Sequence, residues 1–243
     1  MRHLGILAHS TEGAALCFLT YCRHGFSGLG PHNHPDVTLD CIALARSMPF
    51  WDSGDHAAIR GILAESVTRL AAAGSDFFVC PDNTAHMALG LDGPPLPLPG
   101  LHICEVVADE AVRRGFAKVG VLGTRYTMDG PLYADALGSR GLEMAVPPAA
   151  DRELVNTVIF DELLDGELRP ESRAAYVRII EDLAREGCDA VALVCTEIPM
   201  LVTQEDSPLP ILDSTRLLAK AAYDVAVDSA PLPSWRGGPQ PAG

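Results

Sequence analysis

Lysine is nearly absent from this chain of 243 residues: Lys118 and Lys220 are the only two, and the remaining cations are arginines. Acidic residues outnumber lysine and arginine by 32 to 18, which gives a formal net charge of −14 at pH 7. The chain has no polybasic run with which to bind a polyanion. This composition argues against nucleic acid and against an anionic membrane surface as partners.

Long apolar runs are missing as well. No stretch approaches the roughly 20 apolar residues that a membrane-spanning helix needs. The opening segment, MRHLGILAHS, predicts a buried strand rather than a signal peptide, because its apolar stretch is short and nothing resembles a cleavage site. The seven cysteines form no CxxC motif and no even framework, which favours free thiols in a reducing compartment. We therefore expect a cytoplasmic protein.

What the sequence does contain is an alternation of short apolar strands and longer amphipathic helices. This alternation predicts an α/β fold with mostly parallel sheets. The predicted strands are His3–Leu7, Val37–Ile42, Asp76–Cys80, Lys118–Leu122, Ala190–Val194 and Ile211–Leu212. The predicted helices are Asp55–Ala73, His102–Arg114, Pro131–Arg140, Asp151–Leu164, Pro170–Arg185 and Thr215–Asp228. The proline-rich stretch Gly93–Gly100 predicts a hinge or linker.

A comparison of the sequence with itself reveals repeated landmarks. Gly5 and Gly120 each lie in a strand that leads into a polar loop, and each half later contains Gly-x-Asp followed by an apolar strand. The distance from Gly5 to Asp82 is 77 positions, and from Gly120 to Cys195 it is 75. Any two βαβ segments share some features, but four landmarks in the same order and spacing favour a duplicated lobe.

The duplication predicts two α/β lobes related by a pseudo-twofold axis, with the active site in the cleft between them. We place residues 1–98 and 211–228 in the first lobe and residues 99–210 in the second. The Pro/Gly-rich residues 229–243, including Trp235, are expected to form a disordered tail.

Asp82 and Cys195 both follow a predicted strand, where ligands of parallel sheets bind. Across a cleft between lobes, the two groups would approach one carbon from opposite faces. One group could then remove a proton and the other could deliver a proton to the far face, as racemisation requires. Short polar side chains nearby can hold a carboxylate or a developing enolate oxygen: Asn83, Thr84, Thr196 and the loop 124–127.

Three segments together carry a family resemblance. Residues 76–86 (DFFVCPDNTAH), 120–128 (GVLGTRYTM) and 193–199 (LVCTEIP) resemble the signatures of the aspartate/glutamate racemase superfamily. The resemblance extends over roughly residues 3–228. It implies a cofactor-independent enzyme with neither pyridoxal phosphate nor a metal, built from two similar lobes. It also implies that dimers are common, so a homodimer is one expected form.

The sequence departs from the family pattern at several positions. Asp82 stands where two-cysteine racemases have the first catalytic cysteine, and Cys80, two residues earlier, is expected to be a buried structural thiol. Leu154 falls where dicarboxylate racemases tend to carry a lysine, and Leu218 where they tend to carry a histidine. Because both changes remove polar or positive groups, unmodified aspartate or glutamate is not the expected substrate.

The predicted site combines two catalytic residues with a set of substrate-binding residues. Asp82 and Cys195 are the catalytic candidates; the binding candidates are His9, Ser10, Asn83, Thr84, Thr124, Tyr126, Thr127, Thr196 and Glu197. The structural alternatives are a helix N-cap for Asp82, a core thiol for Cys195 and a cap of its own helix for Glu197. The histidines lack carboxylate or cysteine partners at suitable spacing, so no metal site is expected.

The function predicted from these residues is cofactor-independent racemisation or isomerisation of a small, amino-acid-like carboxylate. A lyase or decarboxylase that protonates one face only, through Cys195, is the alternative. A third class, a ligand-binding homologue without catalysis, would bind a small acid and exchange no α-hydrogen.

Overall fold

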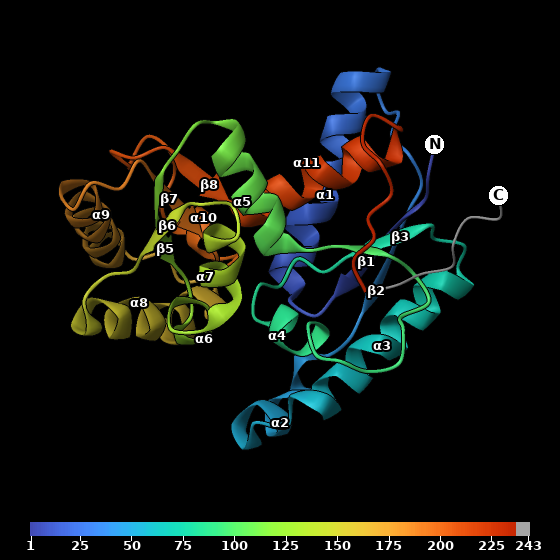
Figure 1. The fold of residues 1–243 in the computed structure, drawn as a ribbon, viewed down its shortest axis with the longest axis horizontal. Helices are drawn as coiled ribbons and strands as arrows, with labels where there is room; N and C mark the ends of the chain where they lie inside the picture. Colours follow the sequence, from blue (N-terminus) through green and yellow to red (C-terminus); the bar gives the residue numbers. More distant parts are fainter. Residues whose placement is uncertain (237–243) are drawn as a thin grey trace. The chain divides into compact units, whose positions relative to one another are not determined.

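The computed structural model describes residues 1–236, and the chain divides into two compact units. Unit 1 comprises Met1–Ile103 and Leu218–Gly243, and unit 2 comprises Cys104–Leu217. Each unit contains one four-stranded sheet in which every strand pair is parallel (Figure 1). The predicted α/β class with parallel sheets is confirmed.

The sheet of unit 1 has the strand order β2-β1-β3-β4. Its strands are β1 (Leu4–Ala8), β2 (Val37–Cys41), β3 (Phe77–Val79) and β4 (Gly100–Leu101). The helices between them are α1 (Thr11–Leu29), the 3₁₀ turn η1 (Leu44–Arg46), α2 (Met48–Ser53), α3 (His56–Ala72) and α4 (Ala85–Leu89). Both α1 and α3 pack against β1.

The sheet of unit 2 repeats this topology with the order β6-β5-β7-β8. Its strands are β5 (Lys118–Leu122), β6 (Glu143–Ala145), β7 (Ala190–Leu193) and β8 (Ile211–Asp213). Its helices are α6 (Arg125–Met128), α7 (Pro131–Gly138), α8 (Ala149–Asp161), the 3₁₀ turn η2 (Leu163–Asp165), α9 (Pro170–Arg185) and α10 (Ile198–Leu201). Two further helices, α5 (Ile103–Arg113) and α11 (Ser214–Ala226), contain the positions where the chain passes from one unit to the other.

The repeated Gly-x-Asp landmark has the same structural role in both units. Gly74 and Gly187 adopt the left-handed conformation, with φ of 89° and 87°, and end the turn after α3 and α9. Asp76 then accepts a hydrogen bond from the backbone N–H of His3 at 2.7 Å. Asp189 accepts equivalent bonds from the N–H groups of Ala117 and Lys118 at 2.8 and 3.0 Å. In each unit, therefore, a carboxylate before the third strand fixes the start of the first.

Two glycines allow a helix to lie close to the first strand of each sheet. A Cβ atom on Gly5 of β1 would lie 3.1 Å from the Leu70 side chain of α3. A Cβ atom on Gly120 of β5 would lie 2.8 Å from the Leu183 side chain of α9. Leu70 and Leu183 are both fully buried, so the space that each glycine leaves is filled by a core leucine.

The boundaries between the units differ from the sequence prediction. We expected Ile211 to begin the return to the first lobe, but Ile211–Asp213 pairs with β7 as the fourth strand of the second sheet. Likewise Gly100, assigned to a linker, begins β4 in unit 1. The chain changes unit in the helix that follows each fourth strand, at 103/104 and 217/218. A strand of two or three residues is too short to give a periodic sequence signal.

The segment that we expected to be a disordered tail is ordered in its first half. The backbone of Gly100 donates a hydrogen bond to the carbonyl of Trp235 at 3.2 Å, beside the edge strand β4. The Trp235 ring stacks on His86 at 5.3 Å between centroids and lies 5.9 Å from Phe78. The prediction is therefore wrong for residues 229–236, and residues 237–243 lie outside the described part of the chain.

Replacing Trp235 with alanine is expected to lower the free energy of unfolding by about 2 kcal/mol, because it removes a half-buried aromatic ring from the core of unit 1. Urea denaturation monitored by circular dichroism measures this loss. The matched control is Phe160→Ala, which removes an aromatic ring that is 42% exposed. Equal stability of Trp235→Ala and wild type would show that Trp235 contributes nothing to the fold.

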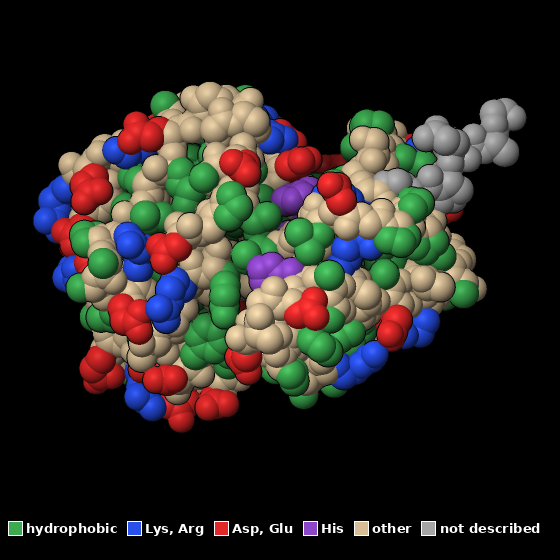
Figure 2. All heavy atoms as spheres, turned by 60° about the horizontal axis from the view of Figure 1, so that its bottom comes forward, with side chains coloured by type: hydrophobic (Ala, Val, Ile, Leu, Met, Phe, Trp, Pro, Cys, Tyr) green, Lys and Arg blue, Asp and Glu red, His purple; other side chains and the backbone are tan. Residues whose placement is uncertain are grey.

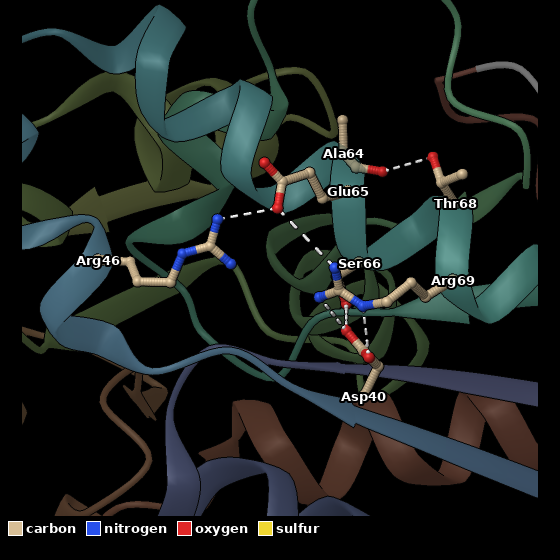
Figure 3. A network of polar contacts seen from close by, with 7 residues as sticks. All are labelled: Asp40, Arg46, Ala64, Glu65, Ser66, Thr68 and Arg69. Atoms are coloured by element: carbon tan, nitrogen blue, oxygen red, sulfur yellow. Dashed lines mark hydrogen bonds and ion pairs between the residues drawn. The ribbon is translucent and has the colours of Figure 1, made fainter.

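A polar network fixes α3 against β2 in unit 1 (Figure 3). Asp40 of β2 accepts hydrogen bonds from Arg69 Nε and Nη2 at 2.8 and 2.7 Å, and from the Ser66 hydroxyl at 2.6 Å. The bonds from Arg69 lower the pKa of Asp40; partial burial opposes this effect, and the Ser66 hydroxyl adds to it. A lowered carboxyl pKa means that this contribution to stability is present at neutral pH and is lost as the pH falls through that pKa.

The described surface mixes charges of both signs. On the face drawn in Figure 2, Lys and Arg side chains are scattered among Asp and Glu side chains rather than gathered in one area. Within residues 1–236, no helix combines the length and the apolar character that crossing a membrane requires.

Candidate active site

The two catalytic candidates occupy equivalent places in the two units. Asp82 follows β3, and Cys195 follows β7; both strands pair with the first strand of their sheet. The carboxyl ends of parallel strands meet at one edge of a sheet, so residues after neighbouring strands come together there. In unit 1 this edge brings Asp82 beside His9, which follows β1.

His9 and Asp82 form a close pair. His9 Nδ1 lies 2.6 Å from Asp82 Oδ2, and His9 Nε2 lies 2.9 Å from the hydroxyl of Ser47. The His9 side chain is 1% exposed and the Asp82 side chain 16% exposed. Both ring nitrogens of His9 are therefore engaged inside unit 1. In this structure the imidazole is a buried partner of Asp82, and contact of His9 with a substrate stays a prediction.

Asp82 also performs the capping role that we had set as its structural alternative. Its Oδ1 accepts the N–H of Ala85, in the first turn of α4, at 3.1 Å. One oxygen thus caps the helix while the other binds His9. Burial acts to raise the pKa of Asp82, but the hydrogen bond and charge of His9 together with the Ala85 N–H outweigh burial, so this pKa lies below its usual value.

His86 stabilises the backbone at Asp82. Its Nδ1 lies 2.9 Å from the carbonyl oxygen of Asp82, and its Nε2 accepts the N–H of Ile103 at 3.4 Å. With Nε2 as an acceptor, the ring is neutral and Nδ1 is the donor. Burial lowers the pKa of His86, in agreement with the neutral form. Cys80, at the end of β3, is fully buried, and burial raises its pKa well above the usual value.

In unit 2, Cys195 is paired with a carboxylate. Its thiol donates a hydrogen bond to Glu197 Oε2 at 2.9 Å. Cys195 is 9% exposed and Glu197 3%, and Thr196 between them is 5% exposed. Glu197 immediately precedes α10, but its side chain does not cap that helix. The carboxylate is therefore directed to the thiol.

The loop after β5 is built around Gly123. A Cβ atom there would lie 2.4 Å from Thr127 Oγ1 and 2.6 Å from Val194 Cγ2, so only glycine fits between the loop and the residue before Cys195. The Thr127 hydroxyl donates to the carbonyl of Thr124 at 2.8 Å and is fully buried. Thr127 therefore stabilises the turn, and its role in binding stays a prediction. Thr124 is 8% exposed and Tyr126 41% exposed.

The remaining predicted residues lie at the same strand exits. Ser10 caps α1 by accepting the N–H of Gly13 at 3.1 Å. Asn83 is buried, and Thr84 stands directly before α4 without capping it through its side chain. Ser47 is the residue that the sequence analysis missed. It lies 38 positions from His9 in the chain and carries no local motif.

No group of three or more His, Cys, Asp or Glu side chains suited to a metal ion occurs among the described residues. His32 and His34, which are spaced like a metal pair, instead lie against Phe26, with ring centroids 6.1 and 5.9 Å away.

Comparison with known proteins agrees with this architecture. The profile of the Asp/Glu/hydantoin racemase family matches residues 21–222. The crystal structure of a putative Asp/Glu racemase from Yersinia pestis superposes with a TM-score of 0.83 at 31% identity, covering 93% of this chain and all of that one. An aspartate racemase homologue from Pyrococcus horikoshii has a TM-score of 0.79 at 26% identity, with the same coverage.

Among curated proteins, the broad specificity amino-acid racemase RacX of Bacillus subtilis is 26% identical over 224 residues, which are 90% of this chain and 95% of RacX. The chain belongs to the Asp/Glu/hydantoin racemase family.

Proposed function

We propose that this protein is a cofactor-independent racemase of an amino acid and that Asp82 and Cys195 are its two proton-transfer groups. One observation carries the proposal. In two units of identical strand order, the exit of the third strand bears an ionisable group held by a buried partner: His9 for Asp82, and Glu197 for Cys195. An arrangement built for proton transfer on both faces of a carbon needs one such group in each half.

In the proposed reaction, both groups act on the α-carbon of one bound substrate. Cys195, as thiolate, takes the α-proton from one face, and the C–H electron pair passes into an enolate. The enolate carbon then takes a proton from Asp82 on the opposite face. The reverse direction uses Asp82 as base and the Cys195 thiol as acid, so both enantiomers are substrates.

The proposed substrate is an amino acid with a single carboxylate. Leu154 packs against the core of unit 2, and Leu218 is fully buried. By resemblance, both stand where dicarboxylate racemases tend to carry a polar or positive group. The similar Bacillus subtilis protein is a broad specificity amino-acid racemase, which supports testing neutral amino acids first. Asn83 and Thr196, which follow Asp82 and Cys195 directly, are the proposed ligands of the α-carboxylate.

A second candidate, a lyase or decarboxylase, is favoured by one observation. His9 and the Ala85 N–H lower the pKa of Asp82. Acting alone, Asp82 would therefore be ionised at neutral pH and would have no proton to donate. In that case Cys195 would protonate an enolate on one face only.

Deuterated water separates the two candidates. Each enantiomer of a panel of neutral amino acids is incubated with the enzyme, and the products are resolved by chiral chromatography with mass detection. A racemase is expected to introduce α-deuterium into both enantiomers. A one-face enzyme labels a single enantiomer, and a binding protein labels neither even when a thermal shift shows that the acid binds.

A further inference from the structure

We propose that His9 and Asp82 hold one proton between them, and that this pair, rather than an isolated carboxylate, is the acid–base group after β3. The inference deepens the proposed function and rests on it for its catalytic part. It assigns His9 as a positioning residue that keeps a proton at Asp82 at neutral pH. The proton count itself depends only on hydrogen bonds within unit 1.

Ser47 determines which nitrogen of His9 carries a proton. The Ser47 hydroxyl donates to the carbonyl oxygen of Leu44 at 2.9 Å. While Ser47 makes this bond, its single hydrogen is not available to His9, and Ser47 Oγ acts toward His9 Nε2 as an acceptor. In this arrangement His9 Nε2, 2.9 Å away, is the donor and carries a hydrogen.

The short contact on the other side of the ring then requires a second hydrogen. Neutral imidazole has one N–H. Because the bond to Ser47 requires that hydrogen on Nε2, Nδ1 of a neutral ring would carry only a lone pair. A lone pair would face the carboxylate at 2.6 Å with nothing between them. In the ligand-free enzyme a proton therefore lies between Nδ1 and Oδ2. The pair is either imidazolium with carboxylate or neutral imidazole with carboxylic acid, and in both forms its net charge is zero.

The pair also accounts for how Asp82 can donate at neutral pH, where an isolated carboxyl group with a lowered pKa would hold no proton. When Asp82 donates, its O–H bond breaks and the new C–H bond forms at the substrate, so the pair is left one proton short and negatively charged until it takes up a proton again. In the reverse direction, the carboxylate takes the α-proton and shares it with Nδ1. A neutral pair also removes a negative charge from the path of a carboxylate substrate in a chain of net charge −14.

Few other titratable groups act on the pair. Among the described residues of unit 1, His86 faces Asp82 from α4 and is neutral, since its Nε2 accepts from the backbone. The buried Cys80 thiol lies within electrostatic range of Asp82, and Cys17 of α1 within range of Cys80.

The first test is ¹⁵N NMR of the histidine side chains in the ligand-free enzyme, with His9 assigned through His9→Asn. At pH 7 we expect a protonated Nε2 and a strongly downfield proton on the Nδ1 side that disappears in Asp82→Asn. A neutral ring with hydrogen on Nδ1 and a bare Nε2 would overturn the proposal, because Asp82 would then be a plain carboxylate.

The second test is the pH profile of kcat/KM for His9→Asn. The asparagine amide can still donate to Asp82 but cannot hold the shared proton. We expect kcat/KM at pH 8 to fall about 100-fold, and the acid limb of the profile to move down by roughly two pH units, from the range in which imidazole titrates toward that of a carboxyl group. A merely structural His9 would lower activity without moving this limb, and that result would refute the catalytic role.

His32→Asn is the matched control for the second test. His32 is exposed and adopts φ of 61°, a conformation that asparagine tolerates, so its profile should equal that of wild type. The two tests also separate this inference from the proposed function. An enzyme that exchanges no α-hydrogen on any amino acid refutes the racemase, while NMR still reports whether the pair holds its proton.

Discussion

Cys195→Ala is expected to abolish racemisation, with a loss of kcat/KM of about 10⁴-fold, because the variant lacks the acid–base group on one face of the substrate carbon. The folded structure should be retained, since alanine fits where the small, 9% exposed thiol was. Polarimetry or chiral chromatography measures the loss. In deuterated water the variant should still label the one enantiomer whose α-hydrogen is directed to Asp82.

Cys188→Ala is the control for this experiment. Cys188 is also buried, at 6% exposure, but it precedes β7 rather than following it, so it lies at the opposite edge of the sheet from Cys195. Its replacement should leave kcat/KM unchanged. Racemisation by Cys195→Ala at the wild-type rate would eliminate Cys195 as a catalytic group.

Asp82→Asn is expected to lower racemisation about 10³-fold, and to leave exchange of the opposite single enantiomer by Cys195 intact. Asparagine has the same shape, and its oxygen can still accept the Ala85 N–H that caps α4, but it cannot take up a proton. Chiral analysis of deuterium incorporation therefore distinguishes catalysis from capping. Complementary labelling by the two variants would establish a two-base mechanism.

Asp82→Ala provides the matching measurement of stability. It removes both roles of the carboxylate, and the lost cap should cost about 1 kcal/mol in urea denaturation, whereas Asp82→Asn should cost less. If Asp82→Asn racemises as fast as wild type, the carboxylate is only a helix cap, and a group other than Asp82 transfers the proton on that face.

The fold was predictable from sequence where the two halves repeat each other. Gly74 and Gly187 turn the chain with the same φ, and Asp76 and Asp189 then bind the start of the first strand in their own unit. Such residues recur because the same backbone geometry must be made twice. The repeated spacing therefore predicted a duplicated topology, and the equivalent strand orders of the two sheets confirm it.

The helix α1 was not predicted, although it is 19 residues long. Gly13, Gly25 and Gly28 interrupt its sequence, and glycine weakens an isolated helix. Packing in unit 1 explains two of them: a Cβ atom on Gly25 would lie 2.4 Å from His34, and one on Gly28 would lie 2.1 Å from the Tyr223 hydroxyl. Tertiary contacts thus require the residues that obscure the helix in the sequence.

The site was predictable in part for a similar reason. Strand exits can be read from sequence, so Asp82 and Cys195 could be placed, and so could His9 after the first strand. Burial and hydrogen-bond partners cannot be read in this way. The bond from His9 to Ser47 spans 38 positions, and the hydroxyl of Thr127 donates to a carbonyl within its own turn. The pattern of strands and loops in the sequence does not indicate these contacts of His9 and Thr127.

The division of the chain has a consequence for biosynthesis. Unit 2 is one continuous segment, whereas unit 1 is completed by residues from Leu218 onward. Arg2 near the start of the chain donates from its backbone to the carbonyl of Ala226 and from its guanidinium to that of Val225. A ribosome therefore releases every strand of both sheets before it releases the residues that close unit 1. The later-synthesised unit can finish folding first, and the earlier one must wait for the last helix.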